Sequence, residues 1–273
     1  MRKVNRQLIS CPARLQNISA ENLLHLQDHS KILSSIYAHD DVKNSLKQLY
    51  FDKCYICECD VSDGKFAVDH YKPKKQFPGL GYTWENLHKI CEKCNLAKEK
   101  KIFFFVHNNS ITDIKLLDPS SSVYNIDDYL KYNVNSLAES ANIGNDPIIL
   151  EKSRVTIDYL NGDIDSEYCK NLPYRRSIRV NKFLKFCMNE LTIHKTRILE
   201  LKMNIEEYLP PENFEELAID QHICFKLNNV DEVYLSERAK FSTCTRVNLY
   251  PTLGITYSEL RKIVNKLKTI LGI

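Results

Sequence analysis

The spacing of hydrophobic residues predicts two short strands and a helix between residues 65 and 101. The segment KFAVDH, at 65–70, is rich in β-forming residues, and NLHKI, at 86–90, has the same character. The stretch between them is punctuated by Pro and Gly, which predicts a loop. CEKCNLAKEKK, at 91–101, then predicts a helix. The result is a ββα unit whose core is too small to be stable alone.

The regions on both sides of this unit carry weaker patterns. Residues 101–117 contain two apolar strands around an Asn108-Asn109 turn, which closes the unit near Asp118. Residues 1–50 predict helices that pack against it. Residues 119–147 are polar and are broken by Pro119, Gly144 and Pro147, which predicts a linker or a surface excursion.

From about Leu172 onward the pattern is helical. Apolar positions recur at alternating steps of three and four until Pro210-Pro211, and they are Leu184, Cys187, Leu191, His194, Ile198, Leu201, Ile205 and Tyr208. We expect this stripe to belong to a core rather than to an interface, with His194 as a packed side chain rather than a ligand.

Length and composition bound the fold class. The chain has 273 residues, of which 43% are hydrophobic and only seven are glycine, so it should form one large or two ordinary globular domains. We predict an α+β fold that is mostly helical. Its parts are an N-terminal helical segment at 1–50, the ββα module at 51–118 and a mainly helical C-terminal region at 119–273.

The cysteines are the first sign of chemistry. No apolar run reaches the roughly 18–20 residues that cross a bilayer, and the first residues lack the apolar stretch of a secretory signal. We therefore expect a cytoplasmic protein with no membrane partner, in which thiols stay reduced. The ten cysteines then need an explanation other than disulfide bonds.

Four cysteines form two matched pairs, Cys54-x2-Cys57 and Cys91-x2-Cys94. Two residues between thiolates let a tight turn direct both sulfurs at one point, and two such turns complete the tetrahedral shell that zinc prefers. One structural Zn²⁺ per chain is expected. Four unrelated buried cysteines are one alternative, and redox dithiols are another, although neither pair lies in a βαβ pattern. The rest are interpreted as small core or surface thiols: Cys11, Cys59, Cys169, Cys187, Cys224 and Cys244.

Four polar residues accompany the cysteine pairs: Asp69, His70, Asn86 and Asn95. With the zinc knuckle they resemble the HNH nuclease superfamily, although the final histidine of that motif is replaced by Asn95. The resemblance implies a zinc-stabilised ββα-metal fold and hydrolysis of nucleic acid. For Asn86 it implies a hydrogen bond to the loop that carries His70.

The chemistry of these residues agrees with that resemblance. Phosphodiester hydrolysis needs an activated water and a cation on the charge that develops. His70, with an unperturbed pKa of about 6.5, is suited to accept the proton of water at neutral pH. Asp69 points to the other face of the strand, and its carboxylate and the Asn95 amide oxygen suit one Mg²⁺ or Mn²⁺ ion. We predict a one-metal mechanism with His70 as general base.

A net charge of +3 is too small to indicate a nucleic-acid partner, so any basic surface must be local. We predict phosphate contacts from lysines beside the motif: Lys72, Lys74, Lys75 and Lys98. A second basic group has no acid among its members, which are Lys170, Arg175, Arg176, Arg179, Lys182 and Lys185. This group is either a solvated helix face or a phosphate-binding strip, in which Arg175, Arg176 and Arg179 are the predicted contacts to nucleic acid. His88 and His107 are interpreted as packing or surface residues.

A softer similarity extends beyond these motifs. The order of several segments resembles the HNH subunit of Septu-type anti-phage systems, some of which accompany retrons. In chain order these segments are MRKVNR, HDDVKNSLKQLYFDKCYIC, VDHYKPK, TWENLHKICEKCN and a late VTIDYLNGD before LPYRRSIR. The resemblance implies an antiviral effector, a separate ATPase partner and, for retron-associated members, a reverse transcriptase with its msDNA. The chain has no GxxxxGK[ST] motif, which assigns any ATP chemistry to the partner.

Two other functions remain as alternatives. A zinc-stabilised adaptor that binds nucleic acid without cutting it should have lost at least one of Asp69, His70, Asn86 and Asn95, and all four are present. A restriction-type or tRNA-cleaving nuclease is the second alternative, disfavoured because no recognisable DNA-reading domain follows the module. Both DNA and structured RNA fit the chemistry as substrates.

Overall fold

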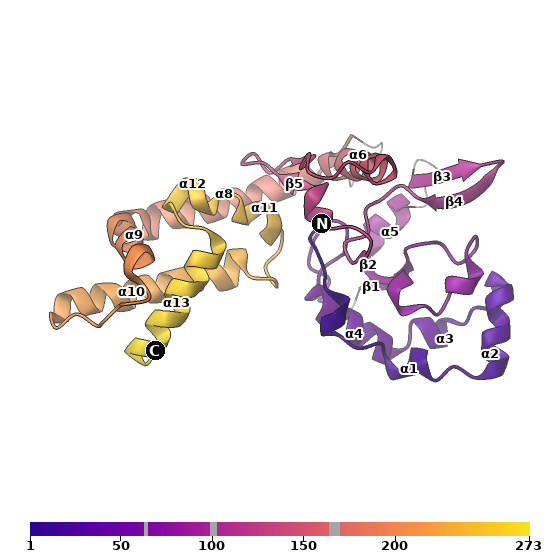
Figure 1. Cartoon of the computed structure of the whole chain (residues 1–273), viewed down its shortest axis with the longest axis horizontal. Helices are drawn as coiled ribbons and strands as arrows, with labels where there is room; N and C mark the ends of the chain where they lie inside the picture. The colour runs from indigo at the N-terminus through magenta and orange to yellow at the C-terminus, as the bar shows by residue number, and fades with distance from the viewer. Residues whose placement is uncertain (63–64, 99–102, 164–169) are drawn as a thin grey trace. The chain divides into compact units, whose positions relative to one another are not determined.

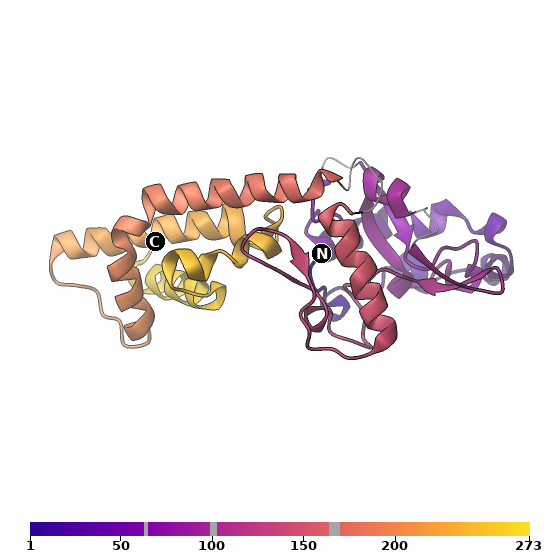
Figure 2. The ribbon, with the colours of Figure 1, turned by 90° about the horizontal axis from the view of Figure 1, so that it is seen from above.

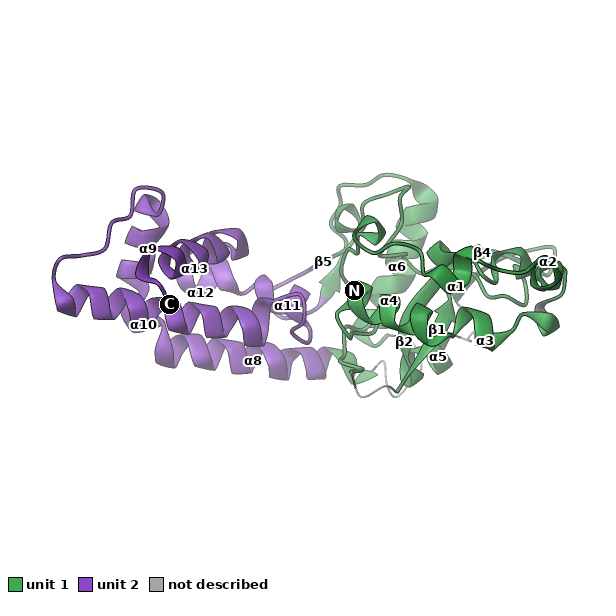
Figure 3. Cartoon of the chain, turned by 90° about the horizontal axis from the view of Figure 1, so that it is seen from below, with its two compact units in different colours: residues 1–131, 138–172 green, residues 132–137, 173–273 purple. Residues whose placement is uncertain are grey.

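A computed structural model describes residues 1–62, 65–98, 103–163 and 170–273 of the chain. These residues form two compact units (Figure 3): unit 1 comprises 1–131 and 138–172, and unit 2 comprises 132–137 and 173–273. Most of the described elements are helices, accompanied by small two-stranded sheets. The predicted α+β, mostly helical fold class is therefore confirmed.

The N-terminal part of unit 1 consists of helices, as its pattern predicts (Figure 1). The longest is α4 (Asp40–Tyr50), whose apolar face is buried, with Val42 and Leu46 fully inaccessible to solvent. It ends at Phe51, which adopts a left-handed conformation with φ 50°. Three short helices precede it: α1 (Ala13–Gln16), α2 (Ala20–Leu24) and α3 (Ser34–Tyr37).

The predicted ββα unit is present in unit 1 (Figure 1). Strands β1 (Phe66–His70) and β2 (Leu87–Cys91) pair in antiparallel fashion, with Asp69 opposite His88. Helix α5 (Glu92–Lys98) follows β2 directly. The second strand starts one residue later than expected because the chain forms a 3-10 turn over Trp84–Asn86. The predicted end of the helix, at 99–101, lies outside the described residues.

The second predicted hairpin is also present, formed by β3 (Phe104–His107) and β4 (Ser110–Ile114). Its turn residues Asn108 and Asn109 have positive φ angles of 47° and 61°, the conformation that matches the twist of two-residue hairpins. The chain then enters the interior of unit 1, where Leu116 is fully buried.

Residues 119–147 differ from the predicted linker or surface excursion. Ile126, Tyr129 and Leu130 are buried, and the short strands β5 (Lys131–Tyr132) and β6 (Ala138–Glu139) follow. Gly144 lies so close to the Tyr129 ring that an added Cβ would approach it to 2.1 Å. The apolar residues are irregularly spaced among polar ones, so no helix or strand period revealed that this segment is packed.

Unit 1 also includes α6 (Pro147–Asn161), which begins at the N-cap Asp146 and ends before Gly162, a left-handed residue with φ 86°. Its Thr156 hydroxyl accepts a hydrogen bond from the Leu117 amide at 2.9 Å. This packing explains why the compact unit extends to residue 172 rather than ending near residue 118.

Unit 2 is helical and is built around the predicted stripe. Most of the stripe, including Cys187, Leu191 and Ile198, lies in a single core, while His194 is half-buried against His222. Figure 2 shows α8 as one long helix. The helices are α8 (Leu172–Glu190), α9 (Lys195–Asn204), α10 (Phe214–Val230), α11 (Ser242–Arg246), α12 (Leu249–Leu253) and α13 (Tyr257–Leu271). Among the described residues, no helix has the length and apolar character needed to cross a bilayer.

Candidate active site and zinc site

The four paired cysteines meet inside unit 1. Their sulfur atoms all lie within 4.8 Å of one another, and all four residues are buried. Cys54 and Cys57 come from the turn after α4, Cys91 ends β2, and Cys94 lies in the first turn of α5. Four sulfurs at this spacing are the ligand set of structural zinc sites, so the cluster can hold a zinc ion.

Hydrogen bonds orient the sulfur atoms of this cluster. The Cys94 amide donates to Cys91 Sγ at 3.4 Å, and the Tyr159 hydroxyl, from α6, donates to Cys94 Sγ at 3.0 Å. Burial raises the pKa of the Cys94 thiol well above its usual value. A bound cation would offset that effect by stabilising the thiolate. Tyr159 escaped sequence analysis because it lies 65 residues from Cys94.

The remaining cysteines differ in their surroundings. Cys59 Sγ lies 3.2 Å from Cys57 Sγ, so this thiol neighbours the cluster instead of being an unrelated core or surface thiol. The interpretation as core thiols is confirmed for the buried residues Cys187, Cys224 and Cys244, and Cys11 is half-buried. Cys169 lies outside the described residues.

Asp69, His70 and Asn95 line a single cavity of about 600 Å³ in unit 1. Strand β1 supplies the first two residues and α5 supplies the third. Lys74, Lys75 and Lys98 line the same cavity. Residues that are up to 29 positions apart in the sequence, such as Asp69 and Lys98, thus converge on one space.

The His70 imidazole is 8% exposed and is held on two sides. Its Nε2 lies 2.9 Å from the Gly81 carbonyl oxygen. Because a carbonyl can only accept, Nε2 carries the proton and Nδ1 is the basic atom of the neutral ring. The ring also packs edge-on against Tyr37 of α3, with centroids 4.6 Å apart. Burial is the main influence on the pKa of His70, which lies below its usual value despite the opposing effect of the Gly81 hydrogen bond.

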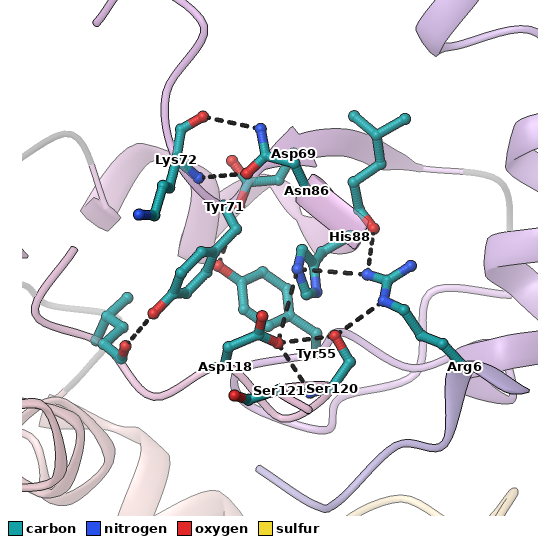
Figure 4. Close-up of polar contacts among 12 residues, drawn as sticks. Arg6, Tyr55, Asp69, Tyr71, Lys72, Asn86, His88, Asp118, Ser120 and Ser121 are labelled. Carbon is teal, nitrogen blue, oxygen red and sulfur yellow. Dashed lines mark hydrogen bonds and ion pairs between the residues drawn. The ribbon is translucent and has the colours of Figure 1, made fainter. Parts of the chain in front are cut away.

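Asn86 fixes the loop that follows His70. Its amide nitrogen donates to the Lys72 carbonyl oxygen at 3.0 Å, and its oxygen accepts from the Lys72 amide at 2.8 Å (Figure 4). The amide nitrogen also donates to the Leu80 carbonyl oxygen at 3.2 Å. A side chain at Gly81 would collide with Ile32, since an added Cβ would approach Ile32 Cδ1 to 2.6 Å. The loop therefore presents the Gly81 carbonyl to His70 from a closely packed position.

The Asp69 carboxylate is held by two donors. Lys98 Nζ lies 2.5 Å from Oδ2, and the Tyr55 hydroxyl donates to the same oxygen at 3.0 Å. Lys98 also donates to the His70 carbonyl oxygen at 2.9 Å, and it is only 4% exposed. Lys98 was predicted to contact phosphate, but in this conformation its ammonium is the counter-ion of Asp69.

His88 lies on the neighbouring strand. Of the two interpretations, a packing residue or a surface residue, the structure supports the first. It is fully buried, with its ring centroid 4.7 Å from that of Tyr55, and burial lowers its pKa well below the usual value. Its Nε2 accepts from Arg6 at 3.4 Å (Figure 4), while Nδ1 lies 2.6 Å from the Tyr50 hydroxyl. Arg6 thereby ties the N-terminal segment to β2. His107 is exposed, which confirms its interpretation as a surface residue.

The lysines of the loop after His70 occupy different surroundings. Lys72 Nζ pairs with Asp113 Oδ1 at 3.2 Å and lines a second cavity, of about 390 Å³, instead of the cavity of His70. Lys74 Nζ lies 3.4 Å from the Tyr37 hydroxyl, and Lys75 is exposed. Lys74 and Lys75 are therefore the loop lysines closest to the candidate chemistry.

The second basic group, most of which lies on α8, does not form a continuous exposed surface. Arg176 is 2% exposed, and its guanidinium donates to the Ser136 carbonyl oxygen at 2.8 Å. Arg179 donates to the Val233 carbonyl oxygen and stacks on Tyr234. Only Arg175 of the three predicted contacts is exposed. This conformation leaves Arg176 no access to phosphate, because residues 132–137 cover it, which a local sequence pattern could not show.

A comparison with known protein families covers the segment that holds these residues. Residues 54–101 match the family model described as HNH endonuclease, a range that includes both cysteine pairs and the Asp69-His70 dipeptide. This segment is an HNH domain. The sequence is also 32% identical over 88 residues to the Septu protein PtuB of Bacillus mycoides (strain KBAB4), an alignment that covers 27% of this chain. The chain spans about 30% of the length of that curated relative. No solved structure matches the chain significantly.

Zinc content should distinguish the four ligands from the neighbouring thiol. Cys54→Ser or Cys91→Ser removes one sulfur and should reduce a content of about one zinc per chain to well below one, with loss of stability in the HNH domain, because structural zinc binding is worth about 10–16 kcal/mol in small domains. Cys59→Ser is the matched control and should retain zinc. Elemental analysis of the purified chain measures this, and a folded wild-type chain without zinc would contradict the assignment.

Proposed function

We propose that this chain is a metal-dependent endonuclease that hydrolyses phosphodiester bonds in nucleic acid, with His70 as general base. The observation that carries the proposal is that Asp69, His70 and Asn95 line one cavity of an HNH domain together with Lys74 and Lys75. This reaction requires a base, oxygen ligands for a metal ion and positive charge around one space.

His70 takes the proton of the attacking water on Nδ1. The ring is neutral at pH 7 because burial lowers its pKa, so it can act without first losing a proton. The Gly81 carbonyl holds Nε2–H and favours the imidazolium that forms after proton transfer. Asn86 and Tyr37 keep the loop and the ring in place, which preserves the alignment of Nδ1 with the water.

Asp69 and Asn95 would hold the Mg²⁺ or Mn²⁺ ion, which supplies positive charge to the phosphate when bound. The residues fit this role because both offer oxygen atoms to the same cavity, and oxygen is the ligand that these ions prefer. Two protein ligands bind such an ion weakly, so it should be lost during purification. Lys74 and Lys75 contact the phosphates that flank the scissile bond.

Variants of His70 and of the loop lysines should separate cutting from binding. His70→Ala removes the base but no zinc ligand, so the variant should keep zinc and bind nucleic acid while cleaving at least about 100-fold more slowly. The double variant Lys74→Ala, Lys75→Ala should instead weaken binding and reduce its salt dependence by about one unit per lost contact. Gel assays on duplex DNA and on a structured RNA, with fluorescence anisotropy for binding, measure both properties. Wild-type cutting by His70→Ala would refute the mechanism.

The pH dependence of cleavage should follow His70. Because a general base must be neutral and burial lowers the pKa of His70, kcat/KM should rise with pH on the acid side, and the midpoint of this rise should lie below about pH 6.5. Residual cleavage by His70→Ala should lack this acid limb. A limb centred above pH 7 in the wild-type enzyme would mean that another group is the base.

We further infer that the chain is the nuclease effector of an anti-phage defence system that acts with a separate ATPase. The similarity to a Septu protein supports this inference. A retron reverse transcriptase with its msDNA is a further candidate partner in systems of that type. Unit 2 offers apolar side chains for a protein contact, since Phe214 is 81% and Phe225 is 65% exposed.

Co-expression with the proposed ATPase partner should test the partnership. The ATPase should co-purify with the tagged full-length chain, and Phe225→Glu should reduce the amount recovered because it places a charge in an apolar contact. Val106→Glu, at a 58% exposed position of unit 1, is the matched control and should have no effect. Failure of the wild-type chain to retain the ATPase would refute the partnership, and an equal loss with both variants would refute its placement on unit 2.

A further inference from the structure

Lys98 occupies space beside the carboxylate that the proposed metal site requires. Its Nζ lies 2.5 Å from Asp69 Oδ2 and 2.9 Å from the His70 carbonyl oxygen, and the side chain is 5% exposed. Tyr55 contributes a neutral donor to the same Asp69 oxygen at 3.0 Å. The carboxylate therefore already has a buried cationic partner before any metal arrives.

The charged residues around the cavity make this competition stronger. Among the described residues, the lining contains one acid, Asp69, and three lysines, Lys74, Lys75 and Lys98. Asn95, the second proposed ligand, is neutral and adds no negative charge. A divalent ion that approaches Asp69 must therefore enter a space in which the formal charges of these described residues sum to a positive charge, and the lysines repel it.

We propose that Lys98 makes binding of the catalytic cation at Asp69 depend on bound nucleic acid, an inference that rests on the nuclease function proposed above. Phosphate groups of the bound strand supply the missing negative charge. Lys98 then turns from Asp69 toward a phosphate, and the carboxylate becomes available to the ion. Lys98 is thus a positioning residue, which holds the Asp69 carboxylate in place while the substrate is absent.

Binding of Mn²⁺, measured by the electron paramagnetic resonance signal of the free ion, tests this coupling without any cleavage. The His70→Ala chain is titrated alone and with a short DNA duplex or an RNA hairpin, and Mn²⁺ bound by the same nucleic acid without protein is subtracted. Nucleic acid should strengthen Mn²⁺ binding at Asp69 by at least about ten-fold, within the ordinary range of coupling between two sites. Equal affinity with and without nucleic acid would overturn the proposal.

Two substitutions identify the cause of the coupling. Lys98→Met, in the same background, removes the competing charge and should bind Mn²⁺ at least about ten-fold more tightly without nucleic acid, so that the added effect of nucleic acid shrinks. Tyr55→Phe removes a hydrogen bond to the same oxygen and no charge, so it should retain the full dependence on nucleic acid. The role of charge would be refuted if Lys98→Met did not bind Mn²⁺ more tightly without nucleic acid. It would also be refuted if Tyr55→Phe tightened Mn²⁺ binding as much as Lys98→Met.

The folded state of these variants is checked by their zinc content. Should Lys98→Met lose zinc, Lys98→Gln takes its place, because the amide removes the charge and keeps a donor for Asp69. The readout also separates this inference from the nuclease proposal. Absence of cleavage by the wild-type chain with metal would refute the nuclease, whereas Mn²⁺ affinity that ignores nucleic acid would refute only the coupling.

Discussion

The four-cysteine cluster is the constraint on which the rest of unit 1 depends. It joins the turn after α4 to the end of β2 and the start of α5, in a ββα unit whose own core is small. Tyr159 attaches α6 to the same cluster through Cys94. A bound zinc ion would therefore stabilise both the HNH domain and the packing of the helix beside it.

The cluster also determines where the candidate catalytic residues lie. Asn95 follows Cys94 directly, and Lys98 lies one helical turn farther along α5, so fixing Cys94 fixes the side of the helix that each presents. Strand β1, paired with the strand that ends at Cys91, brings Asp69 and His70 to the same cavity. The cysteine cluster and the candidate catalytic residues are thus linked through the backbone, although no cysteine is among the described residues that line that cavity.

Local spacing predicted most of what is local in this site. The CxxC pairs, the ββα order and the Asp69-His70 dipeptide each depend on residues close in sequence, and each is found in the structure. The partners of His70 were not predicted, since Tyr37 and the Gly81 carbonyl carry no motif and approach the ring only after folding. Backbone carbonyls leave no trace in a sequence pattern.

Charge was the property that sequence analysis judged least well, because a basic residue has the same letter whether it faces water or a buried acceptor. Arg176 was predicted to contact phosphate and is buried against a backbone carbonyl. Lys98 was predicted to contact phosphate and is paired with Asp69. In this conformation each of the two contacts a group inside the protein instead of an outside ligand.

The balance of charge in the cavity gives meaning to the neutral side chain at position 95. A second carboxylate there would lower the positive charge of the cavity and attract a divalent ion without help. An amide oxygen can coordinate an ion but contributes no net charge, so Asp69 is the only acid that the described residues contribute to the lining, opposed by three lysines. With Asn95 at this position, the proposed metal site is incomplete in charge until phosphate enters, which is why Lys98 and Asn95 are best understood as two parts of one dependence on nucleic acid.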